Sequence, residues 1–165
     1  MTDASSPTPR IRPAGPHDLP FIVEYNRRLA TETESKTLDA SILEAGVAAA
    51  LADPDRLRYW VAEFDGVSCP VGQAAVTREW SDWRNGWIWW FQSVFVDQAF
   101  RGRGVFRALH RRIREEARSS PDVIGLRLYV EDANAPAHAT YRALGMNPGG
   151  YSVYEELWIG TARKG

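Results

Sequence analysis

The sequence predicts a mixed α/β fold, in which a mostly antiparallel central sheet is flanked by helices. The first half has the pattern of a strand, two helices and a run of strands, and the second half alternates helix, strand, helix, strand. A hairpin signal, Asp65-Gly66, joins two strands of the first half, and strands joined by hairpins are antiparallel. The amphipathic helices need an apolar surface to cover, which the sheet provides.

The first half divides at polar and proline-containing breaks. A helix is expected to open at Pro16 and Asp18, and the polar stretch 31–37 is expected to form a loop. The second helix should end at Asp53-Pro54, since the residue before a proline disfavours helix. The expected elements are a strand at 11–14, helices at 16–30 and 39–52, and strands at 57–64, 67–77 and 87–96.

The second half has clearer periodicity. Apolar residues recur every four positions between Gly104 and Arg118, which predicts an amphipathic helix. Alternation from Ile124 to Val130 predicts a strand. Asn134 suits the N-cap of a short helix that Gly145 would end, and a last strand is expected over Tyr151–Ile159.

Length and composition suit one soluble domain. The chain has 165 residues, of which 44% are hydrophobic and 25% are charged, and its formal net charge is −1. We expect one domain over residues 11–160, after a disordered lead-in at 1–10 that has no signal-peptide character. The charge argues against nucleic-acid binding, and no apolar run suits a membrane, so a cytoplasmic protein is expected. One cysteine and scattered histidines argue against a metal site.

Residues 94–106 form the most informative stretch. Val94–Val96 ends a strand, and the Arg/Gly-rich turn Arg101–Gly104 leads into the helix that begins with Val105 and Phe106. A helix start carries unpaired N–H groups and positive potential, and glycines let a ligand approach the backbone. The stretch therefore predicts a phosphate or pyrophosphate site.

Two motifs make the chain resemble the GNAT superfamily of N-acetyltransferases, whose phosphate loop runs Gln/Arg-x-x-Gly-x-Gly/Ala. Arg101 and Gly104 match this loop, and Phe106 departs from its last position. The second family motif is Asn-x-x-Ala-x-x-x-Tyr-x-x-x-Gly-Phe. Four of its positions match and Met146 replaces the phenylalanine; the matches are Asn134, Ala137, Tyr141 and Gly145. The element order agrees over about Ile11 to Trp158.

The resemblance implies acetyl-CoA as acetyl donor. The pantetheine arm would pair with Val94, Phe95 and Val96, and a backbone N–H near Val94 would bind the oxyanion. The pyrophosphate would bind Arg101, Gly102, Arg103, Gly104, Val105 and Phe106. Asn134 would cap its helix. Whether it also contacts the cofactor stays open. Tyr141 would protonate the leaving thiolate, which suits a phenol with a pKa of about 10.

The acceptor side is less defined. The strand segment Trp89–Ser93 has no carboxylate to act as general base. Glu32 and Glu34, in the expected loop after the first helix, are candidates to bind or deprotonate the amine, and Asn26 is a weaker one. Trp80 and Trp90 belong to a tryptophan-rich stretch, which fits either an aromatic wall for the acceptor or a homodimer surface.

The sequence thus predicts direct, acetyl-CoA-dependent acetylation of a primary amine, with a small molecule as the expected acceptor. Acetylation of a protein amino terminus or lysine stays open. So does a non-catalytic acyl-CoA sensor, which the absent strand carboxylate favours. A nucleotide-phosphate binder is disfavoured because the loop lacks the Lys-Ser/Thr ending of a P-loop.

Overall fold

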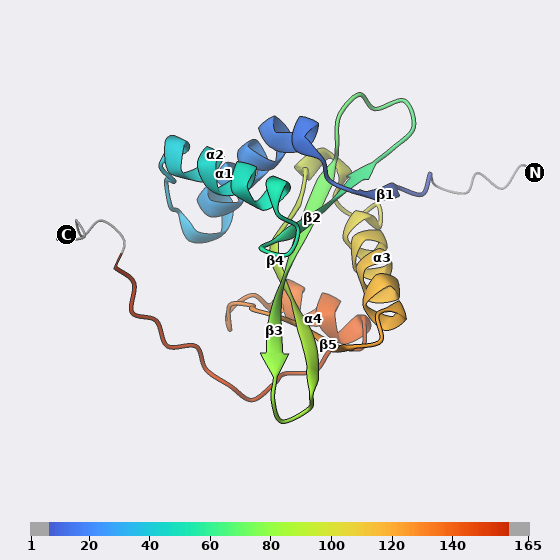
Figure 1. Ribbon diagram of the computed structural model, residues 1–165. Coiled ribbons are helices and arrows are strands. Elements are labelled where there is room, and N and C mark those ends of the chain that lie inside the picture. The colour runs from blue at the N-terminus through green and yellow to red at the C-terminus, as the bar shows by residue number, and fades with distance from the viewer. Residues whose placement is uncertain (1–6, 159–165) are drawn as a thin grey trace, which may run out of the picture. The chain divides into compact units, whose positions relative to one another are not determined.

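A five-stranded sheet organises the chain up to Tyr129 (Figure 1). Its strand order follows the sequence: the first three pairings are antiparallel, and the last, between β4 and β5, is parallel. The strands are β1 (Arg10–Pro13), β2 (Arg58–Glu63), β3 (Gly72–Ser81), β4 (Gly86–Val96) and β5 (Val123–Leu128). This computed structural model describes residues 7–158, and the predicted mixed, mostly antiparallel sheet is confirmed.

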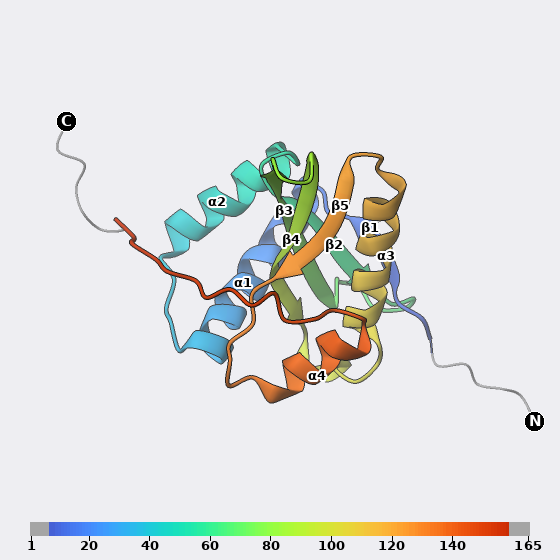
Figure 2. The ribbon, with the colours of Figure 1, turned by 90° about the horizontal axis from the view of Figure 1, so that it is seen from below.

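Helices cover both faces of this sheet (Figure 2). Two helices lie on one face and one on the other, and short 3-10 turns precede two of them. These elements are η1 (Pro16–Asp18), α1 (Leu19–Glu34), α2 (Ala40–Ala52), η2 (Gln98–Phe100) and α3 (Val105–Ser119). Among residues 7–158, no helix combines the length and apolar character that crossing a membrane requires.

Each face of the sheet has its own apolar core. On the α3 face, residues four apart on the helix pack against sheet residues that include Trp60, Trp89 and Phe91, as the periodicity predicts. The buried α3 residues are Val105, Leu109, Ile113 and Ala117. On the other face, Ile22 of α1 and Val47 of α2 pack against the sheet. Removal of this apolar area from water is the main source of stability.

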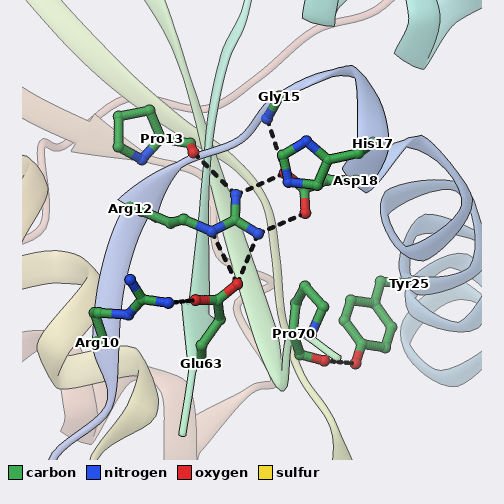
Figure 3. Close-up of polar contacts among 9 residues, drawn as sticks. All are labelled: Arg10, Arg12, Pro13, Gly15, His17, Asp18, Tyr25, Glu63 and Pro70. Atoms are coloured by element: carbon green, nitrogen blue, oxygen red, sulfur yellow. Dashed lines mark hydrogen bonds and ion pairs between the residues drawn. The ribbon is translucent and has the colours of Figure 1, made fainter. Parts of the chain in front are cut away.

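A charged cluster fastens η1 to the edge of the sheet (Figure 3). Arg12 donates to both carboxylate oxygens of the buried Asp18 at 2.8 Å and contacts Glu63 on the neighbouring strand. Burial opposes ionisation of Asp18, but the hydrogen bonds from Arg12 and the Gly15 N–H outweigh it and hold the pKa of Asp18 below its usual value. The cluster therefore positions the start of α1.

The chain from Val130 onward contains one helix in its described part, α4 (Ala135–Ala143). Asn134 caps it as predicted, since its Oδ1 accepts a hydrogen bond from the Ala137 N–H at 3.1 Å. Gly145, just beyond the helix, has a φ of 84°. Glycine adopts this conformation without steric cost.

Several sequence-based boundaries are corrected by the structure. The last strand predicted at 151–159 is wrong over 151–158, which form no strand, and residue 159 lies outside the described residues. The stretch 31–37 is not all loop, because α1 continues to Glu34. Strand β3 begins at Gly72 rather than Val67 and runs on to Ser81. Of the predicted lead-in, Arg10 belongs to β1, and residues 1–6 lie outside the description.

Candidate active site

Strand β4 separates from its neighbour at a β-bulge. Gln73 of β3 faces Phe95, whereas Ala75 faces Gln92, so two residues of β4 stand opposite Ala74. One of the two, Ser93, has a φ of 50°, the left-handed conformation typical of a bulge residue. The parallel pairing with β5 ends just before the bulge, at Phe91 and Leu128. Residues 92–96 therefore have an open edge on the β5 side of the described sheet.

The open edge presents backbone groups. The Asp97 N–H donates to the Val71 carbonyl at 2.9 Å, so the peptide groups of Asp97 and Phe95 face β3. Because successive residues of a strand face opposite sides, the peptide groups of Val94 and Val96 face the open edge. The Phe95 side chain is buried against Tyr25, with ring centroids 5.0 Å apart, and anchors the strand to α1.

The turn after β4 leads to a helix start with no side-chain cap. Gly102 and Gly104 both have positive φ values, 76° and 74°, and a Cβ at either would have no heavy atom within 4 Å. Gly104 is the N-cap of α3 and has no side chain with which to cap the helix, which begins at Val105. Phe106 is half-buried beside His110. This geometry suits an anion.

Ion pairs connect the turn and the end of β4 with α1. Arg101 donates to Glu32 at 2.6 Å and to the Val96 carbonyl at 3.0 Å. Arg28 donates to Asp97 at 2.8 Å, and this hydrogen bond lowers the pKa of Asp97. The guanidinium of Arg103 lies 5.3 Å from the Phe100 ring centroid. The guanidinium of Arg101 is thus engaged within the protein.

The structure distributes the predicted acceptor residues over several places. Glu32 and Glu34 lie in the last turn of α1, where Glu32 pairs with Arg101 and Glu34 with Lys36. The Asn26 side chain points into the sheet, rather than toward the loop after α1, and is 8% exposed.

Trp80 and Trp90 lie on opposite faces of the β3–β4 hairpin. Trp80 pairs in register with Trp87, and the two rings meet edge to face at 5.0 Å between centroids on the α3 face. Trp90 lies on the face that carries α1 and α2 and contacts the ring of Tyr129 at 4.5 Å between centroids. These two tryptophans therefore do not belong to one continuous aromatic wall.

Sequence reasoning did not single out two polar residues of β3, Glu79 and Gln73. Glu79 accepts hydrogen bonds from Trp90 and Arg127, but the predicted strand ended at Thr77, so Glu79 was not placed on it. Gln73 is fully buried and donates to the Ser93 carbonyl at the bulge. A lone amide within the apolar run of β3 was the available signal for Gln73.

Tyr141 lies on α4, in the part of the chain after Val130, and is half-buried. Burial raises the pKa of its phenol above the ordinary value. The phenol therefore keeps its proton at neutral pH. Within residues 7–158, no three His, Cys, Asp or Glu side chains are grouped to hold a metal ion.

The model of the acetyltransferase (GNAT) family matches residues 19–146. The chain belongs to the GNAT family of acetyltransferases. The family uses acetyl-CoA as its acetyl donor, and the match spans both the bulge in β4 and the Tyr141 helix. A comparison with curated proteins finds no match.

Solved structures agree with this membership. A structure described as a possible acetyltransferase from Clostridium difficile 630 is 41% identical, with a TM-score of 0.83, and the alignment covers 92% of this chain and 98% of that one. A predicted acetyltransferase from Clostridium acetobutylicum, solved with acetyl-CoA, shares the fold at 19% identity and a TM-score of 0.73, over 90% and 96% of the two chains. A GCN5-related N-acetyltransferase from Ralstonia eutropha JMP134 also shares the fold, at 19% identity and a TM-score of 0.70, and the alignment covers 90% of this chain and 99% of that one.

Proposed function

We propose that this acetyltransferase transfers the acetyl group of acetyl-CoA directly to a primary amine of a small molecule. The observation that carries the proposal is the open edge of β4, followed at once by the uncapped start of α3. Coenzyme A has a chain of amides and then a pyrophosphate. The open edge offers partners to the amides, and the helix start offers N–H groups to the pyrophosphate.

In this proposal the strand and the turn divide the cofactor between them. The Val94 carbonyl and the peptide groups of Val96 bind the pantetheine amides, and Phe95 holds the strand in place through its buried ring. The N–H groups of the turn and of the α3 start bind the pyrophosphate. The binding residues are Arg101, Gly102, Arg103, Gly104, Val105 and Phe106, with Asn134 holding the start of α4.

The reaction forms a bond between the amine nitrogen and the acetyl carbon and breaks the bond from that carbon to sulfur. The Val94 N–H stabilises the negative oxygen of the tetrahedral intermediate. Tyr141 gives its proton to the departing thiolate, and its raised pKa suits a group that must stay protonated until then. The proton of the amine leaves to water or to a carboxylate.

The acceptor amine enters, in this proposal, on the face that carries α1 and α2. On this face the Trp90 ring and the Glu79 carboxylate already hold a cation, the guanidinium of Arg127, which a cationic amine would have to displace. Of the acceptor residues expected from the sequence, Glu32 forms an ion pair with Arg101, and the buried Asn26 accepts a hydrogen bond from Gln73. Glu79 is likewise paired with Arg127, so these contacts favour neither Glu32 nor Glu79 as the carboxylate that meets the acceptor.

A thiol-release assay tests the proposal. Acetyl-CoA is incubated with the protein and a panel of polyamines, aminoglycosides, amino acids and peptides, and free CoA is measured over time. We expect release with a small amine and weaker release with peptides. Binding of acetyl-CoA without release for any amine would support a non-catalytic sensor instead.

Tyr141→Phe refines the test. Loss of the proton donor should lower kcat by about 100-fold or more and leave acetyl-CoA affinity within about three-fold. Tyr154→Phe is the matched control, because Tyr154 follows α4 and is 95% exposed. Wild-type turnover in Tyr141→Phe would remove the role assigned to this phenol.

A further inference from the structure

Gln73 is a fully buried amide in the middle of an apolar strand. Its side chain has no exposed surface, and its neighbours Ala74 and Ala75 are equally buried. A buried amide is unfavourable unless its hydrogen bonds are satisfied. The partners of Gln73 therefore indicate why the sheet interior contains it.

Gln73 lies between α1 and the bulge of β4. Its Nε2 donates to Asn26 Oδ1 at 2.7 Å and to the Ser93 carbonyl at 3.1 Å. Asn26 in turn donates from Nδ2 to the Tyr59 hydroxyl at 3.1 Å. A carbonyl only accepts hydrogen bonds, so the contact with Ser93 fixes which end of the Gln73 amide is the nitrogen.

The arrangement favours the donors of Gln73 over its acceptor. Both amide hydrogens are used, whereas the buried Oε1 has no hydrogen-bond partner in the described part of the chain. A side chain present only to satisfy its own polar atoms would be expected to pair both ends. The contact with the bulge is thus the feature that the arrangement preserves.

The Ser93 carbonyl and the Val94 N–H belong to one rigid peptide plane. None of the described peptide bonds is cis, and in a trans peptide the C=O and the N–H point in opposite directions. Fixing the carbonyl toward Gln73 therefore fixes the N–H away from it, toward the open edge. The φ of Ser93, 50°, is unfavourable for a residue with a Cβ, so this plane needs such a restraint.

We propose that Gln73, supported by Asn26, is a positioning residue that aims the Val94 N–H at the thioester carbonyl of bound acetyl-CoA. This inference rests on the proposed function, in which that N–H stabilises the oxyanion. It assigns a role to a buried residue that touches neither substrate. Through the hydrogen bonds among Tyr59, Asn26 and Gln73, the orientation of the Val94 N–H depends on the position of α1.

The first test is Gln73→Leu, which keeps the volume and removes the donors. We expect kcat to fall about 10- to 100-fold while the KM for acetyl-CoA changes less than about three-fold, because oxyanion donors act mainly in the transition state. The control is Tyr25→Phe, which removes another buried hydrogen bond, to the Pro70 carbonyl, without involving the bulge. Its kcat should stay near that of the wild type.

Rescue separates positioning from general destabilisation. Adding Ser93→Gly to Gln73→Leu removes the steric cost of the left-handed conformation, so the bulge stays populated without its restraint. We expect the double variant to regain at least three-fold in kcat over Gln73→Leu. If Gln73 only stabilised the fold, the kcat of Gln73→Leu would already equal that of the wild type once it is corrected for the folded fraction measured by circular dichroism.

A readout independent of turnover completes the test. In protein labelled with ¹⁵N-valine, the Val94 amide should shift more with acetyl-CoA than with CoA, and Gln73→Leu should abolish that difference. An equal difference in both proteins would overturn the proposal. If the wild type released no thiol with any amine, the proposed function would fail, and the amide difference would still decide the role of Gln73.

Discussion

Two polar clusters, one part-buried and one buried, join the α1 region to the sheet, and they are built differently. The cluster of Arg12, Asp18 and Glu63 is charged, and every carboxylate in it is paired with a guanidinium (Figure 3). The cluster of Tyr59, Asn26 and Gln73 is neutral and leaves one oxygen without a partner in the described chain. The carboxylates of the first cluster are satisfied within the cluster, whereas the second cluster ends on the Ser93 carbonyl at the bulge of β4.

The difference indicates a division between stability and function. Breaking a buried ion pair leaves an uncompensated charge, so the charged cluster should matter for folding. A neutral amide that restrains one peptide plane adds little stability and can be kept for the direction of an N–H. Substitutions should therefore separate the two clusters by whether they change unfolding or catalysis.

The largest expected effect is on CoA binding and comes from Gly104→Val, at the start of α3 and outside both clusters. A β-branched residue at a φ of 74° is strained, and its side chain would occupy the space above the α3 start. We expect the affinity for CoA to fall at least 100-fold, measured by calorimetric titration.

Gly66→Val is the matched control for Gly104→Val. Gly66 has a φ of 80°, and a Cβ there would have open space around it, but it lies in the β2–β3 turn. The variant should lose comparable stability and keep its CoA affinity. Equal affinity losses in both variants would show that strain, rather than access to the helix start, controls binding.

Asp18→Ala tests the charged cluster. Asp18 is 1% exposed, while its partner Arg12 remains a quarter exposed, so we expect a loss of about 2–3 kcal/mol in the free energy of unfolding. For a chain of this size that corresponds to a fall in Tm of about 5–10 °C, measured by calorimetry. The kcat should not change at temperatures where the variant is folded. A catalytic defect there would break the proposed division.

The smallest effect concerns pH and separates His110 from the charged cluster. Burial, together with the charge of Arg114, lowers the pKa of His110. In the unfolded chain His110 takes up a proton at about pH 6.5, whereas in the folded chain it does so only at lower pH. The free energy of unfolding therefore falls as the pH drops below about 6.5. The slope is at most about 1.4 kcal/mol per pH unit.

The carboxylates of the charged cluster affect stability in a lower pH range than His110. The pKa values of Asp18 and Glu63 are lowered in the fold, so their contribution is present above their unfolded values and is lost as the pH falls through the folded ones. His110→Leu should remove only the loss that begins at pH 6.5, as followed by urea unfolding at several pH values. An unchanged profile between pH 6.5 and 5 would contradict the assignment.

The sequence was sufficient for features that depend on local patterns. The spacing of Val105, Leu109 and Ile113 predicts the buried face of α3, and Asn134 predicts a cap that the structure contains. The Arg/Gly turn predicts a helix start, and in the structure Gly104 is the N-cap of α3. Each of these depends on residues within a few positions of one another.

Features that depend on distant partners could not be predicted. A strand was predicted over 151–159, but residues 151–158 form none, because a strand exists only where a second backbone completes its hydrogen bonds. The polar end of α1 resembled a loop, yet α1 continues to Glu34, and Glu32 in its last turn pairs with the distant Arg101. The bulge at Ser93 arises from a register shift against β3, which no local pattern encodes.

The most direct test is a ¹H–¹⁵N correlation spectrum recorded during titration with acetyl-CoA. We predict the largest shifts at the amides of Val94, Val96, Val105 and Phe106, and none at Arg12, Asp18 or Glu63. Saturation with shifts confined to other parts of the chain, or an unchanged spectrum at 94–106, would contradict the assignment of the open β4 edge and the α3 start as the acetyl-CoA site.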